Sequence, residues 1–348
     1  MTALDPGVGV DVEDVLSSHG RRVHAVLMSR IPDGQPDRWL YDLVRDYPAR
    51  PAKHIRPAIC LATAVAFGGD ESDVVLPAVA IEMLHNAFLV HDDIADGSLR
   101  RRGDPTLHAG AGVGLALNAG DALAVLAQRT IREALDRYPV AVADRVADEF
   151  DTMMARTVEG QAIELGWCRD GIVDLTPEDY LDLIMHKTCW YTTIHPMRVG
   201  ALVGSRGRAD LAPMIRFGFY LGAAFQIRDD LLNLIGSEAQ YGKEILGDLH
   251  EGKRTLMLIH LLGAATPDER RLLDRYLAAD RSERSDAMVD DVHALMLHHR
   301  SIDFAAEFAD GIAGSARDAF EVAFAAAADN EGSRFIEALI PYMLERTA

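Results

Sequence analysis

The chain has 348 residues, of which 49% are hydrophobic and 26% charged, as expected for a globular protein that buries a large core. Its formal net charge of -19 argues against nucleic acid as a partner, because binding a phosphate backbone requires a basic surface. Small phosphorylated ligands remain compatible with this charge, provided that lysines, arginines or a bound metal reverse the sign locally.

The sequence shows no sign of export or membrane insertion. Its N-terminus lacks the basic and apolar segments of a signal peptide, and no run of about 18 uninterrupted apolar residues predicts a membrane span. The cysteines Cys60, Cys168 and Cys189 are scattered without metal-ligand spacing, and we expect them to be buried free thiols. These features predict a cytoplasmic protein.

Periodic apolar residues, separated by breaks rich in Gly and Pro, predict a chain built of helices. The expected helices cover residues 11–47 (broken at 31–36), 58–67, about 74–96, 115–132, 143–165, 176–193 and 211–235, with more over 256–348. Thr176 is the expected N-cap of its helix, since Pro177 and two acids follow it. No strand alternation or hairpin signal is present, so the predicted class is all-α. Residues 1–10 are expected to be a flexible tail, and residues 11–348 a single domain.

A Pro-rich segment, residues 48–57, carries Lys53 and Arg56 at the start of a predicted helix. One interpretation is a solvated loop. The other is an anion site, formed by these cations together with the free N–H groups of the helix start. This segment alone does not decide between them.

The predicted helix over residues 74–96 ends in an acidic cluster, Asp92-Asp93-Ile94-Ala95-Asp96. On a helix, Asp92 and Asp96 share one face with Asp93 beside them, and like charges at this spacing repel one another. A cation between them would remove the repulsion. Carboxylate oxygens suit Mg²⁺, which keeps several waters and usually bridges to substrate phosphates.

A second cluster, Asp229-Asp230-Leu231-Leu232-Asn233, repeats this spacing in the helix over residues 211–235. A single cluster of this kind is more often a solvated helix face than a site. Two clusters that both end apolar helices, and that are both followed by basic residues, indicate a functional site.

Basic residues follow or accompany these clusters. Arg100, Arg101 and Arg102 come directly after the first cluster, where they form either a surface ion-pair network or ligands for diphosphate oxygens. Lys187 lies in an apolar, hydroxyl-rich stretch, where burying it would be costly without an anion. Residues 241–255 contain glycines and two lysines, which would let this loop close over a charged ligand.

In their order and spacing, these motifs resemble the trans-isoprenyl diphosphate synthases, the polyprenyl synthetase family, from about residue 53 to residue 255. The matching segments are Lys53-x-x-Arg56-Pro57, Asp92-Asp93-x-x-Asp96, Arg101-Arg102-Gly103, Gly160-Gln161, Lys187-Thr188, Phe225-Gln226, Asp229-Asp230 and Gly247-Asp248-x-x-Glu251-Gly252-Lys253. The resemblance implies an antiparallel helical bundle around a central cavity, usually paired as a homodimer. It also implies an enzyme, a trans-prenyltransferase most like the short-chain geranylgeranyl and farnesyl diphosphate synthases.

The resemblance also implies roles for individual residues. Three Mg²⁺ ions on an allylic diphosphate would be held by Asp92, Asp93, Asp96 and Asp229, with Asp230 acting through water and Asn233 as an oxygen ligand or hydrogen-bond partner. The residues expected to bind that diphosphate are Arg101, Lys187, Lys243 and Lys253. Those expected to bind isopentenyl diphosphate, without metal, are Lys53, Arg56, His85 and Arg102. Thr188 and Gln226 are expected to line the reacting carbons.

The residue types fit the chemistry that the resemblance implies. Ionising an allylic diphosphate (dimethylallyl, geranyl or farnesyl) requires the departing diphosphate to be stabilised, and Mg²⁺ with Lys and Arg can do this. The double bond of isopentenyl diphosphate then attacks the cation in head-to-tail 1'-4 fashion, and a proton is lost. No side chain stands out as the base, and in the family the released diphosphate is the usual proposal.

Three positions depart from the family pattern or refine it. Ala52 replaces the glycine that usually precedes the lysine of the first motif, and Asn233 replaces the last aspartate of the second cluster. A similar ending with Asn occurs in eukaryotic-type geranylgeranyl synthases, so activity is still expected. Ala95 is small and the first cluster has no two-residue insertion, which argues against the short-chain bacterial type.

Product length depends on what lies below the first cluster. Ala87 and Phe88 stand about one helical turn before Asp92, where the small Ala87 leaves room and an inward Phe88 would shorten the cavity. Phe88 can equally be an ordinary core residue. We expect a C20 product, geranylgeranyl diphosphate, with the C15 product farnesyl diphosphate as the alternative.

Three rival functions are weaker. A terpene cyclase or irregular coupling enzyme of the same fold would not need the cations assigned to isopentenyl diphosphate. A regulatory subunit tends to lose an aspartate cluster, and both are present. A metal-storage bundle would need two Glu-x-x-His motifs, and only Glu82-Met83-Leu84-His85 matches.

Overall fold

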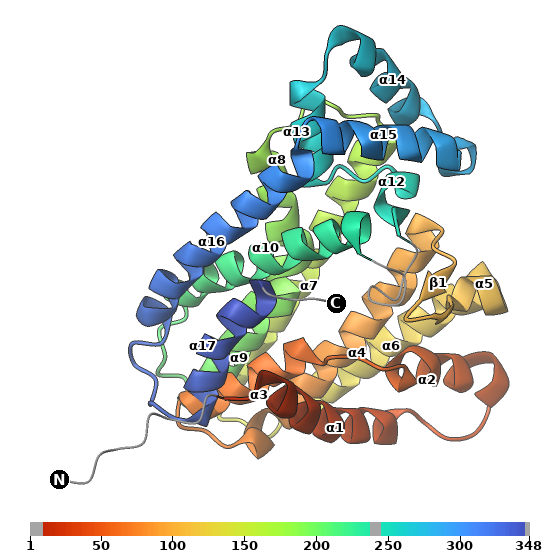
Figure 1. Cartoon of the computed structure of the whole chain (residues 1–348). Coiled ribbons are helices and arrows are strands. Elements are labelled where there is room, and N and C mark those ends of the chain that lie inside the picture. The colour runs from red at the N-terminus through yellow and green to blue at the C-terminus, as the bar shows by residue number, and fades with distance from the viewer. Residues whose placement is uncertain (1–9, 237–244, 345–348) are drawn as a thin grey trace.

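The computed structural model describes residues 10–236 and 245–344, and this part of the chain is almost entirely helical (Figure 1). The predicted all-α class is confirmed. The first half contains α1 Val12–Arg30, η1 Asp37–Tyr41, α2 Asp42–Ala49, α3 Ile55–Ala66, α4 Glu71–Asp96, α5 Leu107–Ala111, α6 Val113–Leu135 and α7 Val140–Arg169. The second half contains α8 Pro177–Ile184, η2 Met185–Ile194, α9 His195–Gly204, α10 Ala212–Ile235, α12 Gly247–Glu251, α13 Leu256–Ala264, α14 Pro267–Ala278, η3 Arg281–Glu283, α15 Asp286–His298, α16 Ser301–Ala323 and α17 Glu331–Leu344.

Helix ends follow the local chemistry of the sequence. The Asp70 side chain accepts from the backbone at the start of α4, and Gly97 ends that helix with φ 65°, a left-handed conformation that glycine adopts without strain. Thr176 forms the predicted N-cap of α8, in a reciprocal capping box with Asp179. Helix α3 begins at Ile55, three residues earlier than predicted, because Pro57 is tolerated within the first helical turn.

A short hairpin corrects the expectation that no hairpin is present. Strands β1 Arg100–Arg101 and β2 Asp104–Pro105 pair antiparallel immediately after α4. Each strand has only two residues, so no alternation of apolar and polar residues could have revealed them. The hairpin turns the chain back and places Arg101 beside the aspartates at the end of α4.

The helices pack around two buried clusters of apolar side chains. One cluster draws on α1 to α7, α9 and α17, and the other on α8, η2, α12, α13, α14 and α15, while α10 and α16 contribute to both. Helix α4 packs against α3 and α6 in the first cluster (Figure 1). By length and composition alone α4 could cross a membrane, but 78% of its most apolar window is buried inside the fold, as in a core helix.

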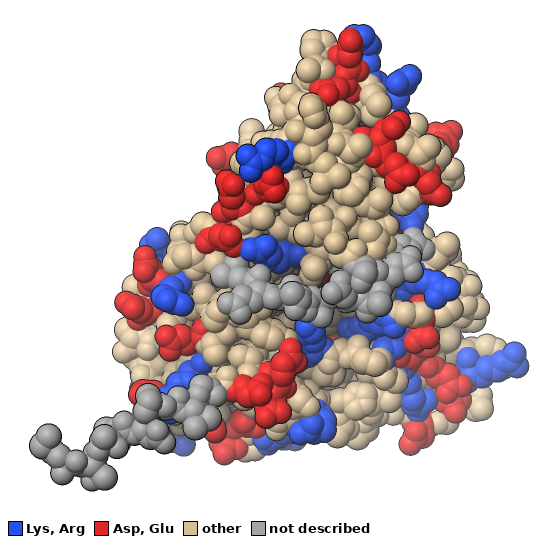
Figure 2. Space-filling model, viewed as in Figure 1, with Lys and Arg blue, Asp and Glu red and all other residues tan. Residues whose placement is uncertain are grey.

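The surface carries charges of both signs, and the predicted burial of the three cysteines is confirmed only in part. Acidic side chains lie in several groups on the face shown in Figure 2, with Lys and Arg between them. Cys60 and Cys189 are buried free thiols as predicted, whereas Cys168 is only half-buried.

Candidate active site

A cavity of about 360 Å³ lies between the two aspartate clusters. The predicted site residues that line it are Lys53, Arg56, His85, Asp92, Arg101, Arg102, Lys187, Thr188, Gln226, Asp229, Asp230 and Lys253. Five predicted residues, Ala87, Phe88, Asp93, Asp96 and Asn233, do not line it, and Lys243 lies outside the described residues. Residues up to two hundred positions apart in the sequence therefore meet at one site.

At the end of α4, the carboxylates of Asp92 and Asp96 lie close to a third carboxylate, that of Glu164 on α7. One ligand oxygen from each of Asp92, Asp96 and Glu164 lies within 4.8 Å of the other two. Burial and the neighbouring Asp92 raise the pKa of Asp96 to about 7, as expected for like charges held close together. Three clustered carboxylate oxygens are the ligands that a hard divalent cation requires, so this donor set fits Mg²⁺.

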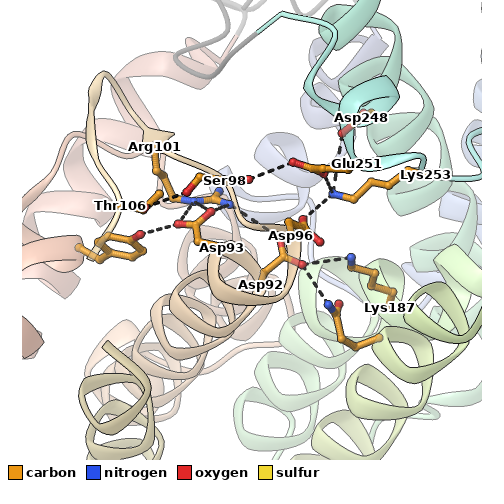
Figure 3. Close-up of polar contacts among 12 residues, drawn as sticks. Asp92, Asp93, Asp96, Ser98, Arg101, Thr106, Lys187, Asp248, Glu251 and Lys253 are labelled. Carbon is orange, nitrogen blue, oxygen red and sulfur yellow. Dashed lines mark hydrogen bonds and ion pairs between the residues drawn. The ribbon is translucent and has the colours of Figure 1, made fainter. Parts of the chain in front are cut away.

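Two lysines reach into these carboxylates (Figure 3). Lys187 Nζ lies 3.2 Å from Asp92 Oδ1 and also contacts Glu164, while Lys253 Nζ lies 2.7 Å from Asp96 Oδ2. Burial alone would lower the pKa of Lys187, but Asp92 and Glu164 outweigh it and raise that pKa above its ordinary value. Lys187 is therefore charged and provides the positive charge that the repelling aspartates require.

Lys187 is placed by an unusual helical turn. It lies on η2, a π-helix of ten residues, and π-helical turns occur frequently at functional sites. Helix α7 passes η2 at Gly160, where an added Cβ would come within 2.3 Å of the Lys187 backbone nitrogen. The next residue, Gln161, donates from Nε2 to Asp92 Oδ1 at 3.2 Å. The Gly160-Gln161 pair thus allows the close approach and then contacts the acidic cluster.

Asp93 has a different environment from its two neighbours. Its carboxylate receives two charge-assisted hydrogen bonds from Arg101, Nε to Oδ2 at 2.7 Å and Nη2 to Oδ1 at 2.5 Å, and a third bond from the Tyr47 hydroxyl. Asp93 is 1% exposed and Arg101 is 7% exposed. Asp93 thus links the end of α4 to α2 through Tyr47 and to the β1–β2 hairpin through Arg101 (Figure 3), while Arg101 still lines the cavity.

The residues of the second cluster also differ from one another in their surroundings. Asp229 lines the cavity. Asp230 is buried in a chain of hydrogen bonds: the Tyr180 hydroxyl and Gln226 Nε2 each donate to it at 2.7 Å. Gln226 Oε1 in turn accepts from Thr188 Oγ1 at 2.9 Å, and burial raises the pKa of Asp230 to about 7. This chain fixes Thr188 and Gln226, both predicted to line the reacting carbons.

Asn233 is directed toward the start of α12. Its Oδ1 accepts from the Asp248 backbone N–H at 3.1 Å, and its carbonyl accepts from the Leu246 N–H at 2.9 Å. These bonds hold the start of α12, whose other end leads to Lys253. Lys253 Nζ also lies 2.7 Å from Glu251, and its pKa stays well above the ordinary value because Asp96 and Glu251 outweigh the effect of burial.

A second cationic group lines another part of the cavity and consists of Lys53, Arg56, His85 and Arg102. Arg56 Nη1 lies 3.3 Å from His85 Nε2, and Lys53 Nζ lies 5.6 Å from the centre of the Tyr342 ring. Burial, reinforced by Arg56 and Arg102, lowers the pKa of His85 well below its ordinary value, so His85 is neutral. Its Nδ1 is buried without a hydrogen-bond partner among the described residues.

Four residues at this site were missed from the sequence. Glu164 follows Gln161 by three positions on α7, a spacing that puts both on one helix face and could have revealed it. Glu82, which accepts from His54 at 3.0 Å beside the second cationic group, was considered only as half of a metal-storage motif. Tyr180 and Tyr191 contact Asp230 and Arg56, respectively, and no sequence signal marks them.

The predicted chain-length residues lie behind the cavity wall. Ala87 is 1% exposed in the core, and the Phe88 ring packs edge-on against Tyr191 with the ring centres 5.8 Å apart. Apolar residues that line the cavity itself include Leu89, Ile184 and Phe225.

Comparisons with known proteins agree with this geometry. The sequence model of the polyprenyl synthetase family matches residues 37–296. A geranylgeranyl diphosphate synthase from Sulfolobus acidocaldarius is 33% identical over 258 residues, which cover 74% of this chain and 76% of that protein. A geranylfarnesyl diphosphate synthase from Natronomonas pharaonis is 28% identical and covers 97% and 98% of the two chains.

The fold is shared with solved structures of such enzymes. The crystal structure of geranylgeranyl pyrophosphate synthetase from Pyrococcus horikoshii superposes with a TM-score of 0.83 at 31% identity, covering 97% of this chain and 98% of that one. The resemblance in the motifs is thereby confirmed, together with the fold that it implied. The chain belongs to the polyprenyl synthetase family and is a prenyltransferase.

Proposed function

We propose that the chain condenses isopentenyl diphosphate with an allylic diphosphate, head to tail, to give the C20 product geranylgeranyl diphosphate. The observation that carries this proposal is that one cavity is lined by two separate cationic groups. One group, Lys187 and Lys253, is interleaved with carboxylates. The other consists of Lys53, Arg56 and Arg102, of which Arg56 lies 3.3 Å from neutral His85. A cyclase acting on one diphosphate would need only the first group.

The allylic diphosphate would bind at the carboxylate side. Asp92, Asp96 and Asp229 are the residues that would hold Mg²⁺, and Glu164 lies within reach of the first two. Bound Mg²⁺ would supply electrostatic stabilisation of the departing diphosphate. Lys187 and Lys253 would also bind oxygens of this diphosphate. Because the two lysines are fixed positive charges in a partly buried site, their electrostatic effect is larger than it would be in water. The buried Asp93–Arg101 pair supports the proposal that these two residues position the cluster.

Thr188 and Gln226 would orient the reacting carbons. Each is restrained by hydrogen bonds that lead to buried Asp230 and Tyr180. Such restraint holds the two substrates in a reactive arrangement and reduces the entropic part of the barrier. The apolar side chains of Leu89, Ile184 and Phe225 would protect the allylic cation from water.

Isopentenyl diphosphate would bind at the second cationic group without metal. Arg56 and Arg102 are suited to bidentate contacts with diphosphate oxygens, and Lys53 adds a third charge. Neutral His85, with a free Nδ1, can donate one hydrogen bond without adding charge.

The proposal also includes a C20 product, a homodimer and a cytoplasmic location. Geranylgeranyl diphosphate synthases among the relatives support C20, and farnesyl diphosphate is the alternative. Exposed apolar residues on α6 and α7, Leu117, Val125 and Val158 among them, support a second copy of the chain as partner.

A product assay tests the proposed reaction. Purified protein with Mg²⁺ and labelled isopentenyl diphosphate receives dimethylallyl, geranyl, farnesyl or geranylgeranyl diphosphate, and the products are sized. Elongation that stops at C20 is the expected result, and Asp151→Asn, at an exposed position on α7, is the control that should match the wild type. A protein that never consumes isopentenyl diphosphate but releases hydrocarbons or alcohols from the allylic substrates would instead be a cyclase.

A further inference from the structure

Tyr191 connects two parts of the site that the sequence analysis treated separately. Its side chain is half-buried, lies on η2 one turn after Lys187, and lines the cavity. Its hydroxyl accepts a hydrogen bond from Arg56 Nη2 at 2.9 Å. The opposite partner is Phe88, whose ring meets the Tyr191 ring edge-on at 5.8 Å and 79°. One aromatic ring therefore contacts a cation of the second group and the predicted chain-length residue.

The contacts with Tyr191 restrain the plane of the Arg56 guanidinium. Besides the hydrogen bond, Arg56 Cζ lies 4.4 Å from the centre of the Tyr191 ring, within the range of a cation–π interaction. Nη1 of Arg56 is near His85, and its Nε is buried without a hydrogen-bond partner among the described residues. Since a guanidinium has five N–H groups, one hydrogen bond to the phenol leaves donors for an anion while removing rotational freedom.

Tyr191 also forms the wall in front of Phe88. Tyr191 lines the cavity and Phe88 does not, so Phe88 supports the wall from behind. Phe88 and Tyr191 both pack against the larger apolar cluster, which limits the movement of either ring. Tyr191, and not Phe88, is therefore the aromatic side chain of this pair that faces the cavity.

We propose that Tyr191 is a positioning and specificity residue. Its hydroxyl orients Arg56 for the diphosphate of isopentenyl diphosphate, and its ring, supported by Phe88, limits how far the product extends. This inference rests on the proposed condensation reaction. It assigns two separable effects to two parts of one side chain.

Two substitutions separate these effects. Tyr191→Phe removes the hydroxyl and keeps the ring, so KM for isopentenyl diphosphate should rise about five- to tenfold, the size expected for losing a partly solvated hydrogen bond to a charged group. The product length and kcat should stay as in the wild type. Tyr191→Leu removes the ring as well, so KM should rise at least as much and the main product should lengthen by at least one C5 unit.

Two further variants serve as controls. Tyr220→Phe changes a tyrosine that also lies beside an arginine, with Arg216 Cζ 5.5 Å from its ring centre, but that does not line the cavity, and it should leave KM and product length unchanged. Phe88→Leu should lengthen the product without changing KM for isopentenyl diphosphate. Thermal unfolding of each variant shows whether the fold is kept; if Tyr191→Leu does not fold, Tyr191→Phe and Phe88→Leu still decide.

The outcomes distinguish this inference from the function on which it rests. Wild-type protein that makes no prenyl diphosphate overturns the proposed function, and this inference with it. Active wild-type protein whose KM is unchanged by Tyr191→Phe overturns the role of the hydroxyl. If a folded Tyr191→Leu or Phe88→Leu variant makes a product of the same length as the wild type, the proposed role of the Tyr191 ring in limiting product length is overturned.

Discussion

The aspartate cluster on α4 and the one on α10 share a spacing but have different surroundings. In the first, Asp92 and Asp96 meet cavity lysines, while Asp93 is held by Arg101 and Tyr47. In the second, Asp229 lines the cavity. Asp230 instead bonds to Tyr180, and Asn233 bonds to the backbone at the start of α12.

The comparison shows that spacing identifies a site but does not assign a role to each residue in it. Residues four apart on a helix lie about 40° apart around its axis, and adjacent residues about 100°. Asp93 therefore faces a different neighbour from Asp92. Which neighbour it meets depends on α2 and the β1–β2 hairpin, not on the motif. The same argument separates Asp229 from Asp230.

The largest effect is expected at the first cluster. If Asp92 helps to hold Mg²⁺ as proposed, Asp92→Asn should lower kcat about a thousandfold, because the variant would lose part of the charge stabilisation of the departing diphosphate. The free energy of unfolding should change little, since the substitution also relieves repulsion with Asp96. Steady-state kinetics and urea denaturation measure the two effects. A kcat within tenfold of the wild type would contradict the assigned role.

Asp93→Asn should instead act mainly on stability. It removes the nearer counter-charge of the buried Arg101 guanidinium and leaves Asp92, whose Oδ2 lies 3.7 Å from Nη2, as the remaining carboxylate partner. This should cost about 3 kcal/mol in the free energy of unfolding, the low end for breaking a buried ion pair. Urea denaturation measures the loss, with Asp104→Asn on the exposed strand β2 as the control. If Asp93→Asn were as stable as this control, the Asp93–Arg101 pair would not hold the end of α4.

An intermediate effect is expected from Tyr180→Phe, which removes a hydrogen-bond partner of Asp230 in the second cluster. Losing the hydroxyl takes one hydrogen bond from buried Asp230, at a cost of about 1–2 kcal/mol of stability. A looser Asp230 should also free Gln226 and Thr188, so that kcat falls about tenfold. Kinetics on folded protein checks this link. Lost stability with unchanged kcat would show that the hydrogen-bond chain does not reach the chemistry.

The smallest effect is expected at Asn233. Asn233→Ala leaves the Asp248 backbone N–H without its side-chain acceptor and should cost about 1 kcal/mol of stability. Asn233→Asp keeps an oxygen acceptor but places a carboxyl group at a position that is only 1% exposed, so it should not be more stable than the wild type. Activity of the Ala variant within a few-fold of the wild type would support an anchoring role, whereas loss of metal-dependent activity would favour a metal ligand.

Much of the fold could be predicted from the sequence because it depends on local chemistry. Apolar periodicity located the helices, and Thr176, followed by Pro177 and two acids, located the start of α8. The π-helical form of η2 could not be predicted, since apolar periodicity does not distinguish a π-helix from an α-helix in a stretch of ten residues. The hairpin after α4 was missed because its strands are too short to show a pattern.

Residues of the candidate site could be predicted where they belong to a sequence motif, but not where only a tertiary contact brings them to the site. Cavity-lining residues such as Lys53, Asp92, Lys187 and Asp229 all belong to spaced motifs. Tyr180 carries no motif, and it acquires a role only because folding brings it to a motif residue. The contacts of Asp93 with Arg101 and Tyr47 are likewise made only by folding, and no motif predicts them.

The central claim is that one cavity holds two diphosphate sites and that only one of them uses metal. Calorimetric titration of isopentenyl diphosphate, and separately of an unreactive allylic diphosphate analogue, with EDTA and then with Mg²⁺ tests it directly. The account predicts that isopentenyl diphosphate binds equally well in both conditions, while the allylic analogue binds tightly only with Mg²⁺. Binding of isopentenyl diphosphate that disappears in EDTA would contradict the claim.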